Sequence, residues 1–311
     1  MSEAAAIICT RNRPDALQNT LESIASQNGS PLSTLIVVDG SDDPTYRKNT
    51  SIERKFDSLS ILHHRYEGPP SAARQRNMGL DLLPVSVDQV FFFDDDITLR
   101  DDCLYHLASA LDSFPSLSGV GASEAPESST TSTFRSAFWK YLFLIDHPSP
   151  GQVLPSGHIS PYYALDPDTE LISTQWLTTC CCLYDREILD EIRFDDALSG
   201  ALLEDLDLSY RIAQISDLGV TPQAQFIHHR SEINRREVWE YAYDRTIQRY
   251  WFVKKNMDRP VCRLAFWWSI VGKVLARTFS RHPDSRSSLQ GLLRGVQAIW
   301  NRSHPLLRLK D

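Results

Sequence analysis

The sequence lacks the cysteine spacing of a metal-binding or disulfide-linked protein. Six cysteines occur, but three of them are consecutive at 180–182, and no two have the CxxC spacing. Because successive side chains of an extended segment point to opposite faces, three adjacent cysteines make a poor metal site. We therefore interpret all six as reduced, mostly buried thiols, as expected of a cytoplasmic protein.

The chain also lacks an apolar run long enough to predict a membrane span. The apolar stretch that begins at Val261 is interrupted by Arg263, Lys273 and Arg277, whereas a spanning helix needs ~20 apolar residues with few charges. The first expected strand begins at Ala4, which leaves no room for a signal peptide or an N-terminal anchor. We therefore expect a cytoplasmic protein without a transmembrane segment.

Positive charge is scarce except at the C-terminus. The net charge is −8, yet residues 259–311 alone carry +8 and the remainder carries −16. Apolar residues at helical spacing in the same region predict a basic amphipathic helical tail over 257–311. Such a tail suits an anionic membrane surface, so a peripheral position on the inner face of the membrane is one expectation. The alternative is that the tail packs on the rest of the chain or on a second subunit of a homo-oligomer. The acidic body argues against a nucleic-acid partner.

Short apolar strands alternate with helices along the first third of the chain. This alternation predicts an α/β fold, namely a Rossmann-like, mainly parallel sheet with helices on both faces. Residues 123–172 break the alternation and are rich in Ser, Thr and Pro, which indicates a functional loop region. Strands are expected at 4–9, 35–38, 60–64, 89–93, 173–184 and 220–227, and helices from 15, over 71–83, after 102, over 203–215 and over 232–256.

Three consecutive carboxylates, Asp94, Asp95 and Asp96, follow the aromatic strand 89–93. Adjacent carboxylates repel one another, so their ionised forms need a cation or a ring of hydrogen-bond donors. The carboxyl ends of strands in α/β sheets are also where ligands bind. Mg²⁺ takes oxygen ligands, often carboxylates together with substrate phosphates. We therefore predict a metal–diphosphate site here, with a plain acidic turn as the alternative.

Two further acidic positions have both a structural and a functional interpretation. Asp39 directly follows an apolar strand, where it is either an Asp-Gly turn residue or an acceptor for a nucleotide base or ribose. Glu204 and Asp205 open a helix, where acids complement the helix dipole. Because Asp207 follows as well, we favour a role for one of the pair as a general base.

Basic side chains are placed where they could meet a diphosphate. Arg74 and Arg76 lie at the start of the helix 71–83, and guanidinium groups and helix N-termini both favour phosphates. The alternative is a solvated helical face. His228 and His229 follow the strand 220–227, and one of them is expected to reach the metal or a phosphate. Alternation lets only one face the site, and the sequence leaves open which.

Five motifs together resemble the family 2 glycosyltransferases, which have the GT-A fold. In order they are IICTRNRP (7–14), VVDGSDD (37–43), AARQRNMG (72–79), FDDDI (93–97) and LEDLDLSYR (203–211). The resemblance covers about residues 4–256. It implies a GT-A catalytic domain over 1–256, with a nucleotide-sugar half at about 1–120 and an acceptor half at about 121–256. It further implies inverting, metal-dependent transfer from a nucleoside-diphosphate sugar to an acceptor hydroxyl on a saccharide or a lipid-linked glycan.

The same resemblance implies a role for each matching residue. Mg²⁺ or Mn²⁺ would be held by Asp96 with His228 or His229. Asp205 would be the general base, and Glu204 would position it or the acceptor. A glycine often found in the acceptor-side strand is replaced near Thr178–Cys182. The donor would be bound by Thr10, Arg13, Asp39, Arg74, Arg76, Asp94 and Asp95, and the acceptor by Trp176 and Thr179.

Two other functions compete with this interpretation. A nucleotidyltransferase would need a glycine-rich loop after the first strand to hold a triphosphate, but Thr10–Pro14 contains no glycine. A non-catalytic relative could bind a nucleotide sugar or a membrane partner as a scaffold. The presence of both Asp96 and Asp205 argues against that alternative.

Overall fold

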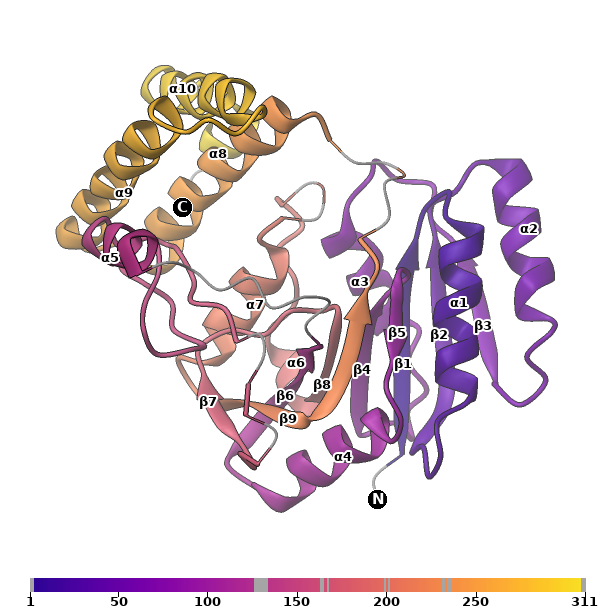
Figure 1. Ribbon diagram of the computed structural model, residues 1–311. Coiled ribbons are helices and arrows are strands. Elements are labelled where there is room, and N and C mark those ends of the chain that lie inside the picture. The colour runs from indigo at the N-terminus through magenta and orange to yellow at the C-terminus, as the bar shows by residue number, and fades with distance from the viewer. Residues whose placement is uncertain are drawn as a thin grey trace. The chain divides into compact units, whose positions relative to one another are not determined.

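The computed structural model describes residues 3–125, 134–162, 165, 166, 168–198, 200, 202–230, 233 and 236–308. The chain groups into two compact units (Figure 1). The first unit comprises Met1–Ser129 and Tyr162–Asn234, and the second comprises Thr130–Pro161 and Arg235–Asp311. The Ser/Thr run 128–133 of the expected loop region lies outside the described residues.

The first unit contains one mixed sheet of nine strands. These are β1 (Ala4–Thr10), β2 (Leu32–Asp39), β3 (Ile61–Arg65), β4 (Gln89–Asp94), β5 (Ile97–Leu99), β6 (Leu117–Glu124), β7 (Ile172–Thr174), β8 (Cys181–Asp185) and β9 (Asp217–His228). Their order is β3-β2-β1-β4-β8-β6-β9-β5, with β7 paired to β9. Strands β1 to β4 pair in parallel, whereas β8 is antiparallel to both of its neighbours, and β5 and β7 are antiparallel to β9.

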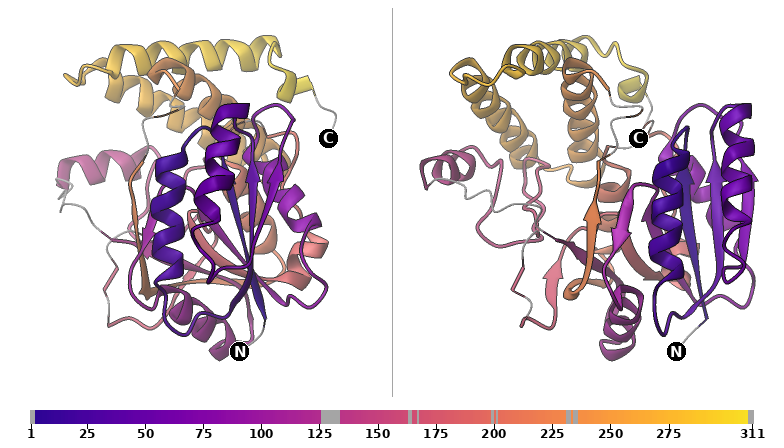
Figure 2. Two further views of the ribbon diagram at one scale, coloured as in Figure 1. Left: turned by 90° about the vertical axis from the view of Figure 1, so that its right-hand side faces the viewer. Right: turned by 45° about the vertical axis from the view of Figure 1, so that its right-hand side comes forward.

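Helices cover both faces of this sheet, as the sequence predicted. They are α1 (Pro14–Ala25), α2 (Asp43–Glu53), α3 (Ala72–Asp81), α4 (Cys103–Ser113), α6 (Arg186–Glu191) and α7 (Glu204–Ile212). Leucines of α1 and α4 pack with Phe91 and Phe93 in one core. On the other face, α3 approaches β1 so closely that a Cβ at Gly79 would lie 2.6 Å from Ile7. In Figure 2, α1 and α2 lie on one side of the strands that they follow.

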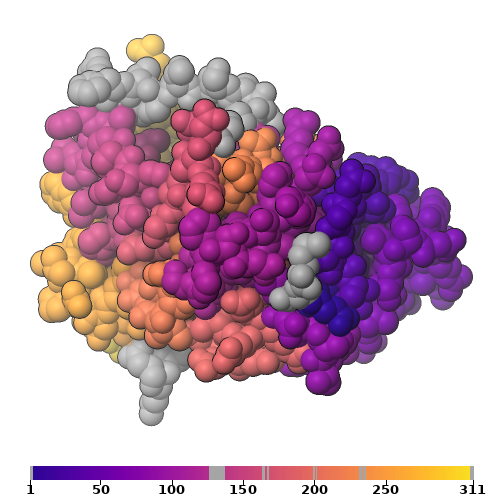
Figure 3. Space-filling view, turned by 90° about the horizontal axis from the view of Figure 1, so that it is seen from below, coloured from indigo at the N-terminus to yellow at the C-terminus, as the bar shows by residue number. Residues whose placement is uncertain are grey.

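The aromatic strand β4 is at the centre of this arrangement. Phe91 and Phe93 stack on one face with their ring centroids 5.6 Å apart. Phe92 points to the opposite face, where it makes edge contacts with Tyr184 and Phe194. Burying one such side chain contributes ~1.5–3 kcal/mol, so β4 is anchored from both sides. In the space-filling view, segments from the first third of the chain lie directly against one another (Figure 3).

The register of the strands gathers the polar residues at one edge of the sheet. Thr10 pairs with Asp39 across β1 and β2, and Cys9 pairs with Asp94 across β1 and β4. The antiparallel pairing of β5 with β9 places Ile97 opposite His228. Residues that are far apart in the sequence therefore meet at the carboxyl end of β4.

The prediction of one strand over 173–184 is wrong, and several helices and strands were not predicted. The segment 173–184 is not one strand, because β7 and β8 are separated by residues 175–180. The apolar residues of this connection misled the prediction, since Trp176 and Leu177 are buried in a loop rather than in a sheet. The elements missed by the sequence analysis are α2, β5, β6, α6 and α5 (Phe134–Leu142).

The second unit is mainly helical in the parts that the structure describes, apart from the turns and loops of residues 143–161. It contains α5, α8 (Val238–Asn256), α9 (Pro260–Thr278), α10 (Ser285–Asn301) and the short 3₁₀ helix Pro305–Arg308. Helical structure of the C-terminal segment is confirmed. Helix α8 groups with these helices, although the sequence analysis assigned it to the catalytic domain. The domain limits near residues 120 and 256 stay predictions. None of the helices described here combines the length and the apolar character that crossing a membrane requires.

Helix α10 approaches α8 through two glycines. A Cβ at Gly291 would collide with the backbone carbonyl of Trp239, and one at Gly295 would lie 2.9 Å from Thr246. Because backbone atoms cannot rotate away as a side chain can, the first contact requires glycine if the helices are to stay this close.

We predict that Gly291→Ala lowers the free energy of unfolding by about 1–3 kcal/mol, because the helices must separate. The loss is expected even though alanine is intrinsically the better helix former by ~1 kcal/mol. Urea denaturation followed by circular dichroism measures the effect. The control is Gln290→Ala at the neighbouring exposed position, which should leave stability nearly unchanged. Equal or higher stability of Gly291→Ala would contradict the close packing.

Candidate active site

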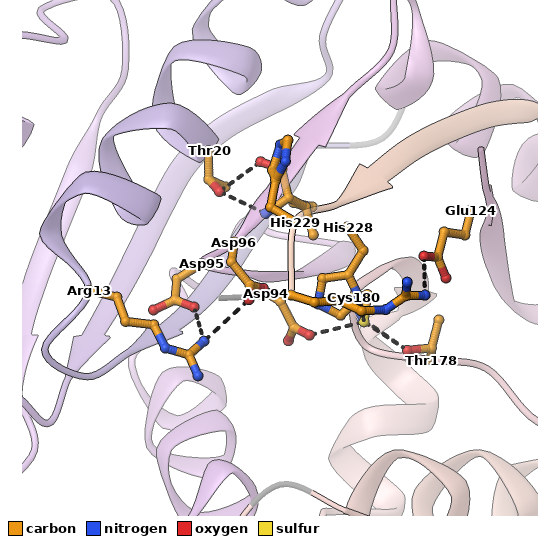
Figure 4. Close-up of polar contacts among 12 residues, drawn as sticks. Arg13, Thr20, Asp94, Asp95, Asp96, Glu124, Thr178, Cys180, His228 and His229 are labelled. Atoms are coloured by element: carbon orange, nitrogen blue, oxygen red, sulfur yellow. Dashed lines mark hydrogen bonds and ion pairs between the residues drawn. The ribbon is translucent and has the colours of Figure 1, made fainter. Parts of the chain in front are cut away.

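A network of charged side chains lies at the carboxyl end of β4 (Figure 4). The hydroxyl of Thr10 donates a hydrogen bond to Oδ2 of Asp95 at 2.7 Å. Nη1 of Arg13 donates to Oδ1 of Asp95 at 2.9 Å and lies 3.5 Å from Oδ2 of Asp96. Burial raises the pKa of Asp95 to about 6, against the opposing effects of Arg13 and Thr10. The end of β1 and the start of α1 thus supply the donors that two adjacent carboxylates need.

Of the two consecutive histidines, the structure selects His228. Its Nε2 lies 3.1 Å from Oδ1 of Asp96, because β9 pairs with β5 directly after the acidic run. Burial opposes protonation of His228, but the contact with Asp96 raises its pKa. The ring of His229 instead lies 2.7 Å from the hydroxyl of Thr98 and points away from Asp94 in Figure 4. His229 contributes only its backbone N–H, which donates to the carbonyl of Asp96.

Asp94, Cys180 and His228 each place one potential metal ligand within 4.8 Å of the others. The thiol of Cys180 donates to Oδ2 of Asp94 at 3.0 Å, and its sulfur lies 3.7 Å from Nδ1 of His228. Burial and the neighbouring Asp94 keep the pKa of Cys180 far above its usual range. Carboxylate oxygen and imidazole suit Mg²⁺ and Mn²⁺, whereas a thiol suits softer ions. The ring of His228 therefore has Asp94 and Cys180 on its Nδ1 side and Asp96 at Nε2, and Asp96 with His228 is the pair whose donor types fit a hard divalent cation.

A buried guanidinium connects the acidic run to helix α7. Arg76 is 5% exposed, and its Nη2 donates to Asp94 at 3.1 Å while its Nη1 donates to Glu204 at 2.7 Å. Burial opposes the charge on Arg76, but the two carboxylates raise its pKa. The other oxygen of Glu204 accepts from the backbone N–H of Leu202 at 2.7 Å. Both oxygens of Glu204 are thus engaged, so this residue holds α7 in place rather than offering a base.

Asp205 is the carboxylate of this pair with the properties of a base. Its Oδ1 accepts from the N–H of Leu206 at 2.7 Å, and the side chain is partly exposed. Burial raises the pKa of Asp205 to about 7; repulsion from Glu204 adds to this effect and Arg76 opposes it. A pKa near neutrality suits proton abstraction at physiological pH. Of the two acids predicted to supply a base, only Asp205 remains a candidate, because both oxygens of Glu204 already accept hydrogen bonds.

Asp39 lies at the same sheet edge but within a closed cluster. It is fully buried and accepts from Nδ2 of Asn49 at 2.7 Å and from the N–H of Ser41 at 2.8 Å. Nε2 of His63 lies 3.2 Å from its Oδ2. Burial opposes ionisation of Asp39, but hydrogen bonds from His63 and Ser41 lower its pKa below the usual value. Its contact with a donor base stays a prediction.

Three other residues predicted for the site lie outside this network. The side chain of Arg74 is exposed, and its Nε donates to the carbonyl of Asp196 at 3.2 Å. Trp176 is buried against Tyr162, with 4.6 Å between the ring centroids. Thr179 is buried in the loop before β8. The donor role of Arg74 and the acceptor roles of Trp176 and Thr179 stay predictions.

The network opens at a pocket of about 220 Å³ next to Arg13 and Asp96. His229 and Ile233 also line it, and the carbonyl of Ile233 accepts a hydrogen bond from Arg13 at 3.2 Å. Arg13 therefore lies between the buried carboxylates and the pocket. A charged ligand entering here would meet Arg13 and Asp96 first.

Comparisons with known structures identify proteins of similar fold. The GalNAc-T7 crystal structure with UDP, GalNAc and Mn²⁺ has a TM-score of 0.60 and 13% identity, covering 98% of this chain and 58% of that one. The mannosyltransferase PcManGT from Pyrobaculum calidifontis, in complex with GDP-Man and Mn²⁺, has a TM-score of 0.59 and 14% identity, covering 96% and 88%. S. aureus TarS has a TM-score of 0.51 and 14% identity, covering 96% and 44%.

These likenesses show the fold, which is the GT-A type that the sequence resemblance implied. This chain spans less than two thirds of the length of GalNAc-T7 and of TarS. No curated protein matches it. The family model described as glycosyl transferase family 2 matches residues 5–193, which is more than half of the chain. The chain therefore belongs to glycosyl transferase family 2, a family of sugar-transferring enzymes.

Proposed function

We propose that the protein transfers a sugar from a nucleoside-diphosphate sugar to an acceptor hydroxyl with inversion at the anomeric carbon. The observation that carries the proposal is the joining of Asp94, Asp95 and Asp96 to Arg13, Arg76 and His228 at one strand end. An anionic donor with its cation matches this mixture of carboxylates and guanidinium groups. Two structures similar in fold were determined with Mn²⁺ and UDP or GDP-Man, which supports the donor class.

The residues present fit a divalent cation such as Mg²⁺ or Mn²⁺. Asp96 and His228 would hold it, because Oδ1 of Asp96 lies 3.1 Å from Nε2 of His228 and oxygen and imidazole donors suit these ions. When bound, the cation supplies charge neutralisation for the departing nucleoside diphosphate. Thr10 and Arg13 fix the orientation of Asp95 beside this site.

The protein's own residues would carry the proton transfer. Asp205 removes the proton of the acceptor hydroxyl while that oxygen attacks the anomeric carbon and the nucleoside diphosphate leaves from the opposite face. One displacement of this kind inverts the configuration, whereas a covalent intermediate would retain it. Arg13, whose side chain is 24% exposed, is the guanidinium best placed to meet the leaving phosphates. Arg76 orients Glu204 and lowers the charge around Asp94.

The second unit supports a position on a membrane surface. On α9, Val261, Leu264, Trp268 and Val271 recur at helical spacing and are 45–70% exposed. Nε1 of Trp268 donates to the carbonyl of Leu142 at 2.8 Å, which joins α9 to the exposed apolar end of α5. An apolar face beside a basic segment suits an anionic lipid interface. We propose that this α5–α9 face binds the membrane and that the acceptor is a lipid-linked saccharide.

We predict that Asp205→Asn lowers turnover by about 10²–10⁴-fold while leaving donor binding intact, because only the base is lost. In the unsubstituted protein, turnover should fall as the pH drops below about 7, since protonation removes the base. This acidic limb should be absent from the residual activity of the variant. Steady-state rates and donor calorimetry measure both effects. Unchanged turnover would remove Asp205 from the role and favour a non-catalytic relative.

We predict that Asp96→Ala weakens Mn²⁺-dependent binding of a nucleoside diphosphate at least tenfold, because one ligand of the cation is removed. Calorimetry with and without Mn²⁺ separates this effect from direct phosphate contacts. Asp101→Ala, at a nearby exposed acid, is the matched control and should bind normally. If both variants bind alike, the cation is not held at Asp96.

We predict that Leu264→Glu combined with Val261→Glu abolishes flotation of the full chain with anionic liposomes, because charged side chains would have to enter the interface. Val85→Glu changes a more exposed apolar residue of the first unit and serves as the control. Flotation that persists in the double variant would show that the α5–α9 face does not bind lipid.

A further inference from the structure

The helices of the second unit enclose a small pocket lined by four cationic side chains. Arg245 and Arg249 come from α8, and Lys273 and Arg277 come from α9. The pocket has a volume of about 90 Å³, and its remaining lining includes Thr246 and Ser288 but no acidic residue. All of these residues belong to the second unit, so the pocket is built from one compact body.

Arg249 is the least solvated of these cations. It is 2% exposed, and neither its Nε nor its Nη2 has a hydrogen-bond partner in the structure. Its Nη1 contacts the imidazole of His158, and its guanidinium lies 5.2 Å from the ring centroid of Phe266. Burial and the surrounding cations hold the pKa of His158 well below its usual value, so the ring accepts from Arg249 without bringing a compensating charge.

The other three cations are not neutralised either. Nη1 of Arg245 donates to the hydroxyl of Tyr241 at 2.9 Å, and Nε of Arg277 donates to the hydroxyl of Ser288 at 2.7 Å. Within the part of the chain that the structure describes, neither arginine nor Lys273 forms an ion pair with a carboxylate. By contrast, Arg13 and Arg76 in the first unit each contact two carboxylates. The second unit therefore holds an excess of positive charge at one point.

Such a cluster is unfavourable without a counter-ion. Burial and repulsion from Arg245 and Arg277 lower the pKa of Arg249 to about 9. Burial, together with Arg249, Arg245 and Arg277, also lowers the pKa of Lys273 far below its usual range. Buried guanidinium N–H groups without acceptors add a desolvation penalty. An anion in the pocket would relieve the repulsion and fill the unused donors at once.

We propose that this pocket binds a phosphate group, either of a free phosphate compound or of a phospholipid headgroup. A phosphate carries enough negative charge to balance several cations, and arginine forks bind its oxygens in pairs. The hydroxyl of Ser288, which accepts from Arg277, adds a neutral donor at the same site, whereas that of Thr246 already donates to the carbonyl of Ala242. The excess of hydrogen-bond donors and positive charge in this pocket thus indicates an anionic ligand. This inference does not depend on the nucleotide sugar proposed for the first unit.

The test is calorimetry and thermal unfolding of the full chain with inorganic phosphate, compared with sodium chloride at equal ionic strength. Phosphate is expected to bind and to raise the Tm of the unsubstituted protein. Lys273→Met should weaken binding at least tenfold and remove the Tm increase. In chloride alone it should not lower the Tm, since it removes one of several like charges. The matched control, Arg286→Met on the exposed side of α10, should behave like the unsubstituted protein.

Vesicles distinguish the two sources of the phosphate. A lipid headgroup is identified if the protein binds vesicles containing phosphatidic acid more tightly than phosphatidylcholine vesicles. This preference should be lost in Lys273→Met, and inorganic phosphate should displace the vesicles. Binding of inorganic phosphate without this lipid preference would identify a free phosphate compound. The proposal is overturned if neither probe binds more than its control, or if Lys273→Met and Arg286→Met bind equally well.

Discussion

The balance of charge at the carboxyl end of β4 is the constraint on which the first unit depends. Three consecutive carboxylates cannot remain ionised beside an aromatic core unless cations and donors surround them. Arg76 meets this requirement by joining Asp94 to Glu204, and Arg13 does so for Asp95 and Asp96. Removing one partner of such a buried pair typically costs about 3–5 kcal/mol. The contacts that position α7, and with it Asp205, are therefore the contacts that neutralise the acidic run.

The two units carry opposite and incomplete charge clusters. In the first unit, protein cations contact most of the carboxylates, and His228 lies between Asp96 at its Nε2 and the Asp94–Cys180 pair on its Nδ1 side. In the second unit, Arg249 and Lys273 lie among further cations without a carboxylate partner in the described structure. We expect each cluster to be more stable with a bound ion of the opposite sign, namely the proposed divalent cation in the first unit and the proposed phosphate group in the second. The class of ligand proposed for each unit thus follows from the charge that the protein's own residues leave uncompensated.

The sequence predicted what depends on local patterns and missed what depends on long-range pairing. Strands β1 to β4 were recognisable because their apolar runs end in turn residues. The predicted parallel order of these strands was enough to place the acidic run and Arg76 at the same end of the sheet, where they are in contact. The choice of His228 over His229 needed the pairing of β5 with β9, which no local pattern reveals. Cys180 lies at the site because residues 175–180 form a loop, whereas the sequence predicted one continuous strand over 173–184. Lys273 and Arg277 were interpreted as interruptions of an apolar stripe, because spacing does not show that α8 brings two more arginines to them.

The most direct test of the central claim is a crystal structure of the full chain with Mn²⁺ and a nucleoside diphosphate, with anomalous scattering used to locate the metal. The account predicts one strong Mn²⁺ peak within coordination distance of Asp96 and His228, with the diphosphate on the side of Arg13. A metal and nucleotide bound elsewhere, with the carboxylates of β4 still contacting only protein groups, would contradict it.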